Sequence, residues 1–323
     1  MSRPKSLGKL LALAFTVCAL LAPSAASAAT VVNGDFETGN LSGWTLVNTT
    51  FNGSWFPYAG TKTPFADGGD PPFFAPPQGN WAAVTDEVEP VTAVMYQDIA
   101  LEPGWTHSIS ATLYYLSFAP INAQPTLLTP TGGPEGPQQY RVDVIKPTAP
   151  LLTLAPEDIL ATLFANKFGD PQVMAPTAFS ADLSALAGQT VRLRLVNAVN
   201  NSVYNAGADA ISITSTPPSN VFTKGKLQLN KQNGTAKLAI NVPGAGTLKV
   251  ANGGKGKAPK LIKAATKNPT KAGKVWLPIK PTGTAKTKLK EKGKLAFKVK
   301  VTFTPTGGFA ATKNFGGTLK LED

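Results

Sequence analysis

The chain has 323 residues, with 31 Lys and Arg against 19 Asp and Glu and a formal net charge of +12. Its one Cys, Cys18, lies in the first 28 residues. For the rest of the chain this excludes a disulfide framework, a thiolate metal site and a Cys nucleophile. The length is sufficient for two domains of ordinary size.

Residues 1–28 have the pattern of a signal peptide. Three basic residues precede an apolar run, Leu10 to Leu21, that is too short to span a bilayer. Ala26-Ser27-Ala28 then has the small-residue pattern of a cleavage site. We therefore predict a secreted, extracellular protein without an integral membrane anchor, and cell-wall association is an open alternative.

Charge divides the remaining chain into two parts. Residues 29–220 carry six Lys and Arg against sixteen Asp and Glu, whereas residues 221–323 carry twenty-two Lys, no Arg and three acids. The change falls near Pro217-Pro218, which predicts an acidic domain over 29–216, a linker over 217–220 and a basic domain over 221–323. Lys lacks the planar fork with which Arg reads bases, so we expect diffuse attraction to polyanions and no sequence-specific nucleic-acid binding.

Side chains of the acidic domain alternate between apolar and polar, which predicts strands. The strands are expected at Leu113–Phe118, Tyr140–Ile145, Val191–Val196 and Ala208–Ile213. Several short strands with irregular loops are typical of a β-sandwich. Pro and two acids at the start of residues 156–164 favour one short helix there.

Four stretches of the acidic domain follow the order of a known fold. They are Asn33–Gly39 with Leu41–Trp44, Pro77–Ala83, Tyr96–Ile99, and Ser180–Leu183 with Ala187–Arg194 and Ala208–Ile213. In that order they resemble the opening, second, third and closing strands of galactose-binding-like jelly rolls, a superfamily that includes carbohydrate-binding modules. The resemblance implies an all-β jelly-roll sandwich with Trp44 in its core, but not a particular ligand, because the fold hosts many functions.

The same resemblance implies a structural calcium ion. In related carbohydrate-binding modules, the glutamate of the opening motif and the aspartate of the closing strand share a Ca²⁺ with backbone carbonyls. These positions are Glu37 and Asp209 here, and hard oxygen ligands suit calcium. Ala210 stands where the family usually has a second acid, and the alternative is that both acids are turn residues without a metal.

Residues 51–76 are rich in Pro, Gly and aromatic side chains, and we predict a surface loop. Trp and Tyr rings suit the apolar face of a sugar while their polar edges stay hydrated. We therefore predict a ligand-binding site of Trp55, Tyr58 and Trp81, with Arg141 or Arg194 as hydrogen-bond donors. The alternative for each ring is a place in a satellite core.

The basic domain also alternates. Strands are predicted at Ala236–Val242, Thr247–Val250 and Lys294–Phe303, with turns at 243–246 and 305–308. An Ig-like sandwich is the natural architecture for about 100 such residues. Lys occupies the polar phase of these strands, so one sheet face or edge should be cationic.

Four stretches of this domain resemble a Lys-rich C-terminal β-domain of secreted actinobacterial proteins. They are residues 234–236, 242–248, 288–290 and 304–308. The resemblance implies an envelope-associated module with no known activity. One interpretation is retention on an anionic cell-wall polymer, and the other is a solvated strand face that also blocks edge-to-edge aggregation.

Catalytic motifs are missing from the sequence. It has no H-E-x-x-H, no G-x-S-x-G, no P-loop and no G-x-G-x-x-G followed by a helix. The single His107 is expected to be structural, and Asp86-Glu87 with Glu89 forms one acidic run, not two acids that flank a sugar. We therefore predict that the protein is not an enzyme.

The leading hypothesis is a carbohydrate- or cell-wall-binding surface protein. A structural or adhesive envelope protein without a sugar site is the main alternative, and a polysaccharide hydrolase or its accessory protein is the second.

Overall fold

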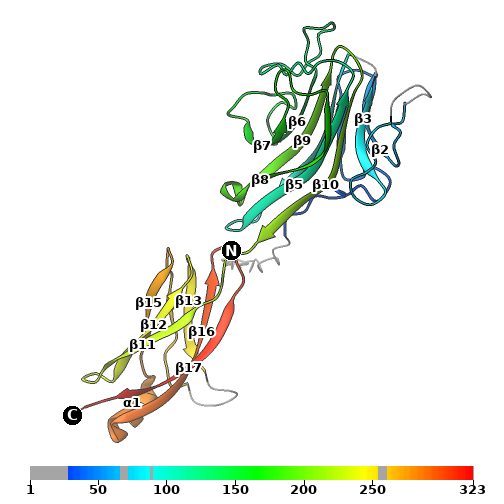
Figure 1. Cartoon of the computed structure of the whole chain (residues 1–323). Helices are drawn as coiled ribbons and strands as arrows, with labels where there is room; N and C mark the ends of the chain where they lie inside the picture. Colours follow the sequence, from blue (N-terminus) through cyan, green and yellow to red (C-terminus); the bar gives the residue numbers. More distant parts are fainter. Residues whose placement is uncertain (1–27, 66–71, 88–89, 254–259, 323) are drawn as a thin grey trace, which may run out of the picture.

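The computed structural model describes residues 28–65, 72–87, 90–253 and 260–322. Figure 1 shows two β-sandwiches arranged end to end. Residues 1–27 of the predicted signal peptide lie outside the described residues, and so does Glu89. No helix in the described residues is long and apolar enough to cross a membrane.

The first sandwich consists of two five-stranded antiparallel sheets, in the orders β1-β4-β9-β6-β7 and β2-β3-β10-β5-β8. Its strands are β1 (Thr45–Asn48), β2 (Gly53–Tyr58), β3 (Ala82–Glu87), β4 (Val91–Ala100), β5 (Thr106–Ser117), β6 (Gln139–Ile145), β7 (Ile159–Ala165), β8 (Val173–Asp182), β9 (Thr190–Val199) and β10 (Tyr204–Thr216), with a 3₁₀ turn at Ser184–Leu186. The all-β sandwich expected from the sequence is confirmed.

The core between these sheets comes from alternate side chains of both. On β9, Val191, Leu193 and Leu195 are fully buried and point inward, while the residues between them point outward. Trp44 is 8% exposed and stacks on Phe36 with ring centroids 5.9 Å apart, as expected for a core residue. Period-two alternation thus sets which face of each strand is internal.

The second sandwich has a three-stranded sheet, β11-β12-β15, and a four-stranded sheet, β14-β13-β16-β17. Its elements are β11 (Thr223–Asn230), β12 (Thr235–Val242), β13 (Gly246–Asn252), β14 (Ala265–Lys267), β15 (Gly273–Ile279), α1 (Gly283–Lys292), β16 (Lys294–Pro305) and β17 (Ala311–Lys320). Leu238, Val299 and Phe303 belong to its separate core. The three strands predicted here are confirmed, and α1, which was not predicted, contributes Ala285 and Leu289 to the core.

Three local predictions are wrong. Residues 159–165 form strand β7 in place of a helix, because they pair with β6 and complete a sheet. Residues 53–58 form strand β2 within the expected surface loop. Residues 33–39 of the opening motif form turns, and the first strand begins at Thr45.

The two sandwiches contact each other through two turns. The indole Nε1 of Trp105 donates a hydrogen bond to the carbonyl of Gly307 at 2.8 Å. The Trp105 ring also packs edge-on against Phe309, with centroids 5.9 Å apart. The turn before β5 is thus fixed to the turn after β16.

Candidate functional site

A hollow of about 560 Å³ opens beside the point where β10 bends. Asp209 pairs with Thr112 and Ser212 pairs with Ser110, so Ala210 and Ile211 together face a single residue of β5. Such a bulge bends the strand and redirects its side chains. The amide of Ile211 donates to the carbonyl of Gly34 at 2.8 Å, which places the turn of residues 33–36 over the bulge.

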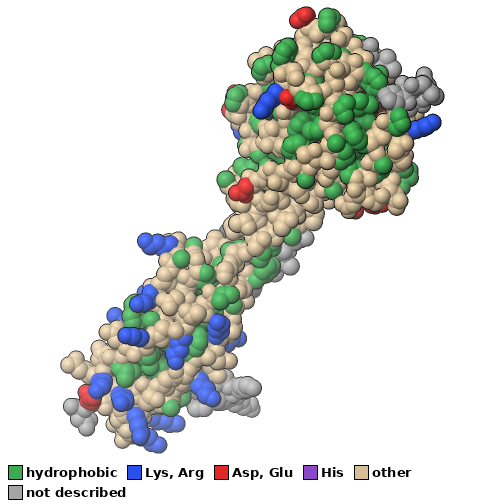
Figure 2. Space-filling view, in the orientation of Figure 1, with side chains coloured by type: hydrophobic (Ala, Val, Ile, Leu, Met, Phe, Trp, Pro, Cys, Tyr) green, Lys and Arg blue, Asp and Glu red, His purple; other side chains and the backbone are tan. Residues whose placement is uncertain are grey.

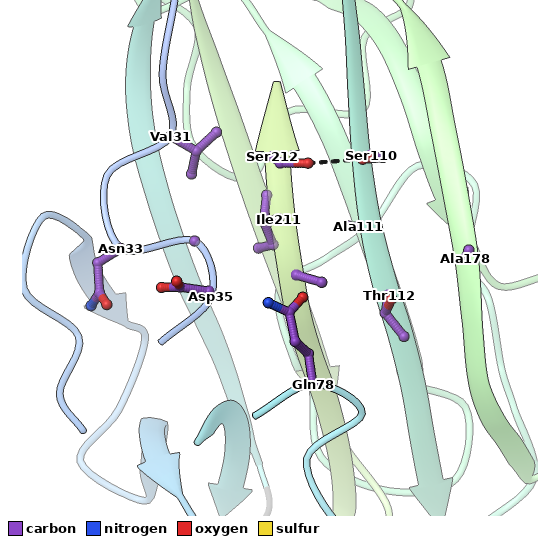
Figure 3. Close-up of a pocket in the computed structure, with 12 residues that line it drawn as sticks. Val31, Asn33, Asp35, Gln78, Ser110, Ala111, Thr112, Ala178, Ile211 and Ser212 are labelled. Atoms are coloured by element: carbon purple, nitrogen blue, oxygen red, sulfur yellow. Dashed lines mark hydrogen bonds between the residues drawn. The ribbon is translucent and has the colours of Figure 1, made fainter. Parts of the chain in front are cut away.

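The hollow is lined by hydrogen-bonding groups from two loops and two strands. Asp35 and Gln78, both exposed, extend from the loops, as Figure 3 shows. Ser110 and Ser212 approach each other on β5 and β10, with their hydroxyl oxygens 3.1 Å apart, and Thr112 lies one outward position further along β5. Among the described residues, the lining contains no aromatic side chain and one charged group, Asp35.

The polar lining continues along the outer face of the sheet. Ser108, Ser110 and Thr112 alternate with buried residues of β5, and Ser110 has Ser180 of β8 beside it. Thr214 of β10 pairs with Ser108 on the other side. We call these five residues the Ser/Thr face, which extends the hollow over three strands.

Glu37 fixes the loop that carries Gln78. Its Oε1 accepts hydrogen bonds from the amides of Asn80 and Trp81, each at 2.9 Å. Gly79, between Gln78 and Asn80, has a φ of +61°, and a Cβ there would lie 2.3 Å from the Glu37 carboxylate. Glycine is therefore required for this close approach.

Asp209 of β10 also holds the loop that carries Gln78. Its carboxylate is fully buried and accepts the amide of Gln78 at 2.9 Å and that of Ala210 at 2.6 Å. Burial raises the pKa of Asp209 to about 6, and the negative charges of Glu37 and Asp35 add to the rise. The structure thus brings the two predicted metal ligands together around one loop.

The fit of these residues to calcium is partial. The gathering of Asp35, Glu37 and Asp209 favours a cation, but three carboxylate oxygens of Glu37 and Asp209 already accept amide hydrogens. Calcium takes six to eight oxygen ligands. Within the described residues no group of three or more His, Cys, Asp or Glu side chains is placed to hold a metal ion.

The predicted aromatic ligand residues do not share a surface. Trp55 is 1% exposed, contacts Tyr140 and donates to the carbonyl of Ala93. Tyr58 is 3% exposed, and its hydroxyl lies 2.6 Å from that of Tyr114. Trp81 is half-buried and packs against the core.

The two predicted arginine donors are engaged inside the protein. Arg194 is fully buried, and its Nη2 donates to Asp143 at 2.9 Å. Arg141 donates to the same carboxylate through Nε and Nη2, each at 3.0 Å. The carbonyl of Leu151 accepts from Arg194 and covers it. Both guanidinium groups therefore stabilise the outer face of β6 and β9.

The hollow itself was missed by the sequence reasoning. Asp35 and Gln78 lie within the motifs that carry the family resemblance, and this is the one sequence signal that could have identified them as site residues. Ser110, Thr112 and Ser212 are ordinary outward-facing strand residues, and what brings them into a hollow is the bulge in β10.

The groups considered for catalysis are internal. His107 is 1% exposed, with Nδ1 2.9 Å from the Ser215 hydroxyl and Nε2 3.1 Å from the carbonyl of Glu102. Asp86 and Glu87 are 4% and 1% exposed in β3. Burial raises the pKa of Glu87 well above 4.5, and neighbouring Asp86 adds to the rise.

Solved structures with a similar fold include binding domains and an enzyme. The tandem CBM22 domains of Paenibacillus barcinonensis Xyn10C are 10% identical, with 93% of this chain and 92% of that one covered and a TM-score of 0.35. The K3 adhesin domain of Lys-gingipain from Porphyromonas gingivalis w83 is 14% identical, with 57% and 96% covered and a TM-score of 0.34. A cyclase from Fischerella sp. TAU is also 14% identical, with 58% and 96% covered and a TM-score of 0.32.

No protein-family model and no curated protein sequence matches the chain. The structural matches have low identities and low TM-scores, so the functional argument rests on the geometry of this chain.

Proposed function

We propose that the protein is a secreted, non-catalytic binding protein whose first sandwich binds a carbohydrate in the hollow beside the β10 bulge. The observation that carries the proposal is the lining: one carboxylate, two side-chain amides and three hydroxyls among the described residues, around about 560 Å³. That volume lies in the range of small-ligand sites. A saccharide presents many hydroxyls, each a donor and an acceptor, and such a lining can satisfy them.

Rigid support favours this proposal. Asp35 and Gln78 come from loops whose backbones are fixed by the bonds to Glu37, Asp209 and Ile211 described above. A site that is already formed loses little conformational entropy when it binds. The Ser/Thr face offers further hydroxyls to a longer chain of sugars.

The test is binding of the full chain without its signal peptide to a glycan array, followed by calorimetry on the best glycan. Asp35→Ala with Gln78→Ala is expected to lower affinity at least tenfold, or about 1.4 kcal/mol. Glu157→Ala removes an exposed acid elsewhere and serves as the matched control. Equal affinities in the two variants would refute the hollow as the site.

The alternative is a structural or adhesive envelope protein without a sugar site. The internal placement of Trp55, Tyr58, Arg141 and Arg194 favours it, because these side chains are committed to the fold. Their role as ligand residues stays a prediction. A glycan array without a single binding sugar would select this alternative.

Lack of enzymatic activity is part of the proposal. Glu87 has its carboxyl bonded to Asn197 inside the sandwich, and His107 is bonded to the backbone and to Ser215. Turnover of a polysaccharide that is lost in Asp86→Asn/Glu87→Gln would instead support the hydrolase alternative.

We also propose a structural role for calcium at Glu37 and Asp209, where negative charge gathers. Added Ca²⁺ should raise the melting temperature of the wild type, and Glu37→Ala should abolish the rise. Unchanged melting after chelation would remove calcium from the proposal.

For the second sandwich we propose electrostatic retention on an anionic polymer of the cell envelope. Figure 2 shows Lys side chains distributed over this domain and few over the first. Retention should weaken steeply with salt, since exposed charges are screened over about 10 Å at 0.1 M.

A further inference from the structure

The outer face of the three-stranded sheet in the second sandwich carries an exposed tryptophan. Trp276 of β15 is 38% exposed, while its neighbours Val275 and Leu277 point into the core. It pairs with Ala239 of β12. Trp276 thus places a large aromatic ring on the solvent side of a sheet that also carries exposed Lys side chains.

The surroundings of Trp276 make a flat platform. Ala239 points outward, yet it is 1% exposed, and its cross-strand partner is Trp276. On its other side Gly225 of β11 adds no side chain, and a Cβ there would lie 3.0 Å from that of Ala239. We infer from this burial that the indole lies over Ala239 and leaves its other face to solvent.

Cations flank the platform on both sides. Lys274 and Pro278 lie two residues before and after Trp276 on β15, and Pro278 pairs with Lys237 of β12. Residues two apart on a strand are separated by roughly 7 Å. Both Lys side chains are exposed, and no Asp or Glu occurs in β11, β12 or β15.

The face continues into a hollow of about 520 Å³ at the β11–β12 turn. Lys237, Gln228 and Lys231 line it together with the polar side chains of that turn. Lys237 both lines this hollow and pairs with Pro278 beside Trp276, and we call Trp276, Lys274, Lys237 and the hollow the Trp276 strip.

We propose that the Trp276 strip binds an acidic polysaccharide whose sugar rings carry carboxylates. The apolar face of one ring stacks on the open indole face, and carboxylates of adjacent sugars pair with Lys274 and Lys237. Charge complementarity selects this partner over a neutral glycan, because Lys237 and Lys274 lie on strands that contain no acid. Lys231 of the hollow is already paired with Glu322 and is not counted among these cations.

Two other polyanions fit the strip less well. A polymer of phosphodiesters without sugar rings would use the lysines but not the indole. A single-stranded nucleic acid could stack a base on Trp276, but the domain has no Arg for bidentate phosphate or base contacts.

The proposal supplies a site for the electrostatic retention described above and rests on that part of the proposed function. It is independent of the hollow in the first sandwich. The variants below leave the first sandwich unchanged, so its glycan binding serves as an internal control.

The test measures binding of the full chain without its signal peptide to polygalacturonate at low salt, with dextran and oligothymidylate as competitors. Trp276→Ala keeps the charge and is expected to weaken polygalacturonate binding at least tenfold, while Trp276→Tyr retains most of it. Unchanged thermal unfolding shows that the variants remain folded.

A pair of double variants distinguishes binding at the Trp276 strip from diffuse electrostatic attraction to the whole domain. Lys237→Ala/Lys274→Ala removes two charges from the strip, and Lys298→Ala/Lys300→Ala removes two from exposed outward positions of β16 on the opposite sheet. The first should weaken binding clearly more than the second. Dextran should not compete.

Three results would overturn the proposal. Equal, salt-sensitive losses in both double variants with no effect of Trp276→Ala would leave diffuse retention and refute the strip. No binding of the wild type to polygalacturonate at low salt would refute both the Trp276 strip and diffuse retention on this polymer. Competition by oligothymidylate that also depends on Trp276 and exceeds that of polygalacturonate would identify a nucleic-acid surface instead.

Discussion

Among single residues, Glu87 links burial most directly to pH. Its Oε1 accepts a hydrogen bond from Asn197 at 2.9 Å, while Oε2 has no partner within the described residues. Desolvation raises its pKa well above 4.5 in the folded protein, and the charge of Asp86 adds to the rise. Between pH 4.5 and this higher pKa the folded state binds more protons than the unfolded state, so stability falls as pH rises.

We predict that Glu87→Gln removes this pH dependence. Below pH 4.5 the variant and the wild type should have similar free energies of unfolding, because both side chains are neutral. Towards pH 8 the variant should become more stable than the wild type by more than about 1 kcal/mol. The folded wild type must then either ionise a buried carboxyl or keep it protonated at a pH where the unfolded chain ionises it, and both are unfavourable. Urea unfolding across pH measures the difference.

Glu135→Gln is the control for this prediction, because Glu135 is exposed and neutralising it changes the same charge. A stability difference between Glu87→Gln and the wild type that stays constant from pH 4 to pH 8 would show that Glu87 titrates normally in the folded state.

At the scale of elements, the outer face of β6 and β9 depends on a buried ion cluster. Asp143 accepts hydrogen bonds from Arg141, Arg194 and the hydroxyl of Thr162, and Arg194 is fully buried. Desolvation lowers the pKa of Arg194, and Asp143 counteracts this. Leu152 and Leu154 from the segment before β7 pack over this face beside Val196.

Asp143→Ala is therefore expected to destabilise the protein by about 3–5 kcal/mol, because it leaves a buried guanidinium without its counter-charge. Asp98→Ala is the comparison. Asp98 pairs with Arg192 on the same sheet at 2.6 Å, but its side chain is 41% exposed, so its loss should cost about 1 kcal/mol or less. Denaturant unfolding of both variants checks the ratio, and equal losses would contradict it.

The elements also show what the sequence could predict. Strands with clear alternation, such as β9 and β16, follow from local pattern, because one face of each is buried along its length. β7 was mistaken for a helix, because its start carries helix-like signals while its pairing with β6 is a long-range effect. The aromatic residues of β2 look like a ligand platform in sequence, and only tertiary packing reveals that Trp55 is core.

On the scale of the whole molecule, one close contact decides how firmly the two sandwiches are joined. Gly307 has a φ of +74°, and a Cβ there would lie 1.9 Å from the carbonyl oxygen of Pro103. The same glycine accepts the hydrogen bond from Trp105. A methyl group at this position must push the two turns apart.

A joined molecule matters if both proposed sites engage one polymer network. The second binding event then becomes intramolecular, and a fixed geometry sets its effective concentration. A loosened junction should change avidity for a mixed matrix while leaving each separate affinity unchanged. Only the basic domain attracts a polyanion, because the other domain is acidic, so salt should weaken this avidity through the basic domain.

We predict that Gly307→Ala broadens the distance distribution in small-angle X-ray scattering, because the junction loosens while each sandwich stays folded. Gly132→Ala is the matched control: Gly132 has a φ of +75°, and a Cβ there meets no atom within 4 Å. Both substitutions carry the same left-handed backbone strain of roughly 1–2 kcal/mol, so only the clash differs. Identical scattering from the two variants would mean that the close approach of Gly307 to Pro103 does not hold the sandwiches together.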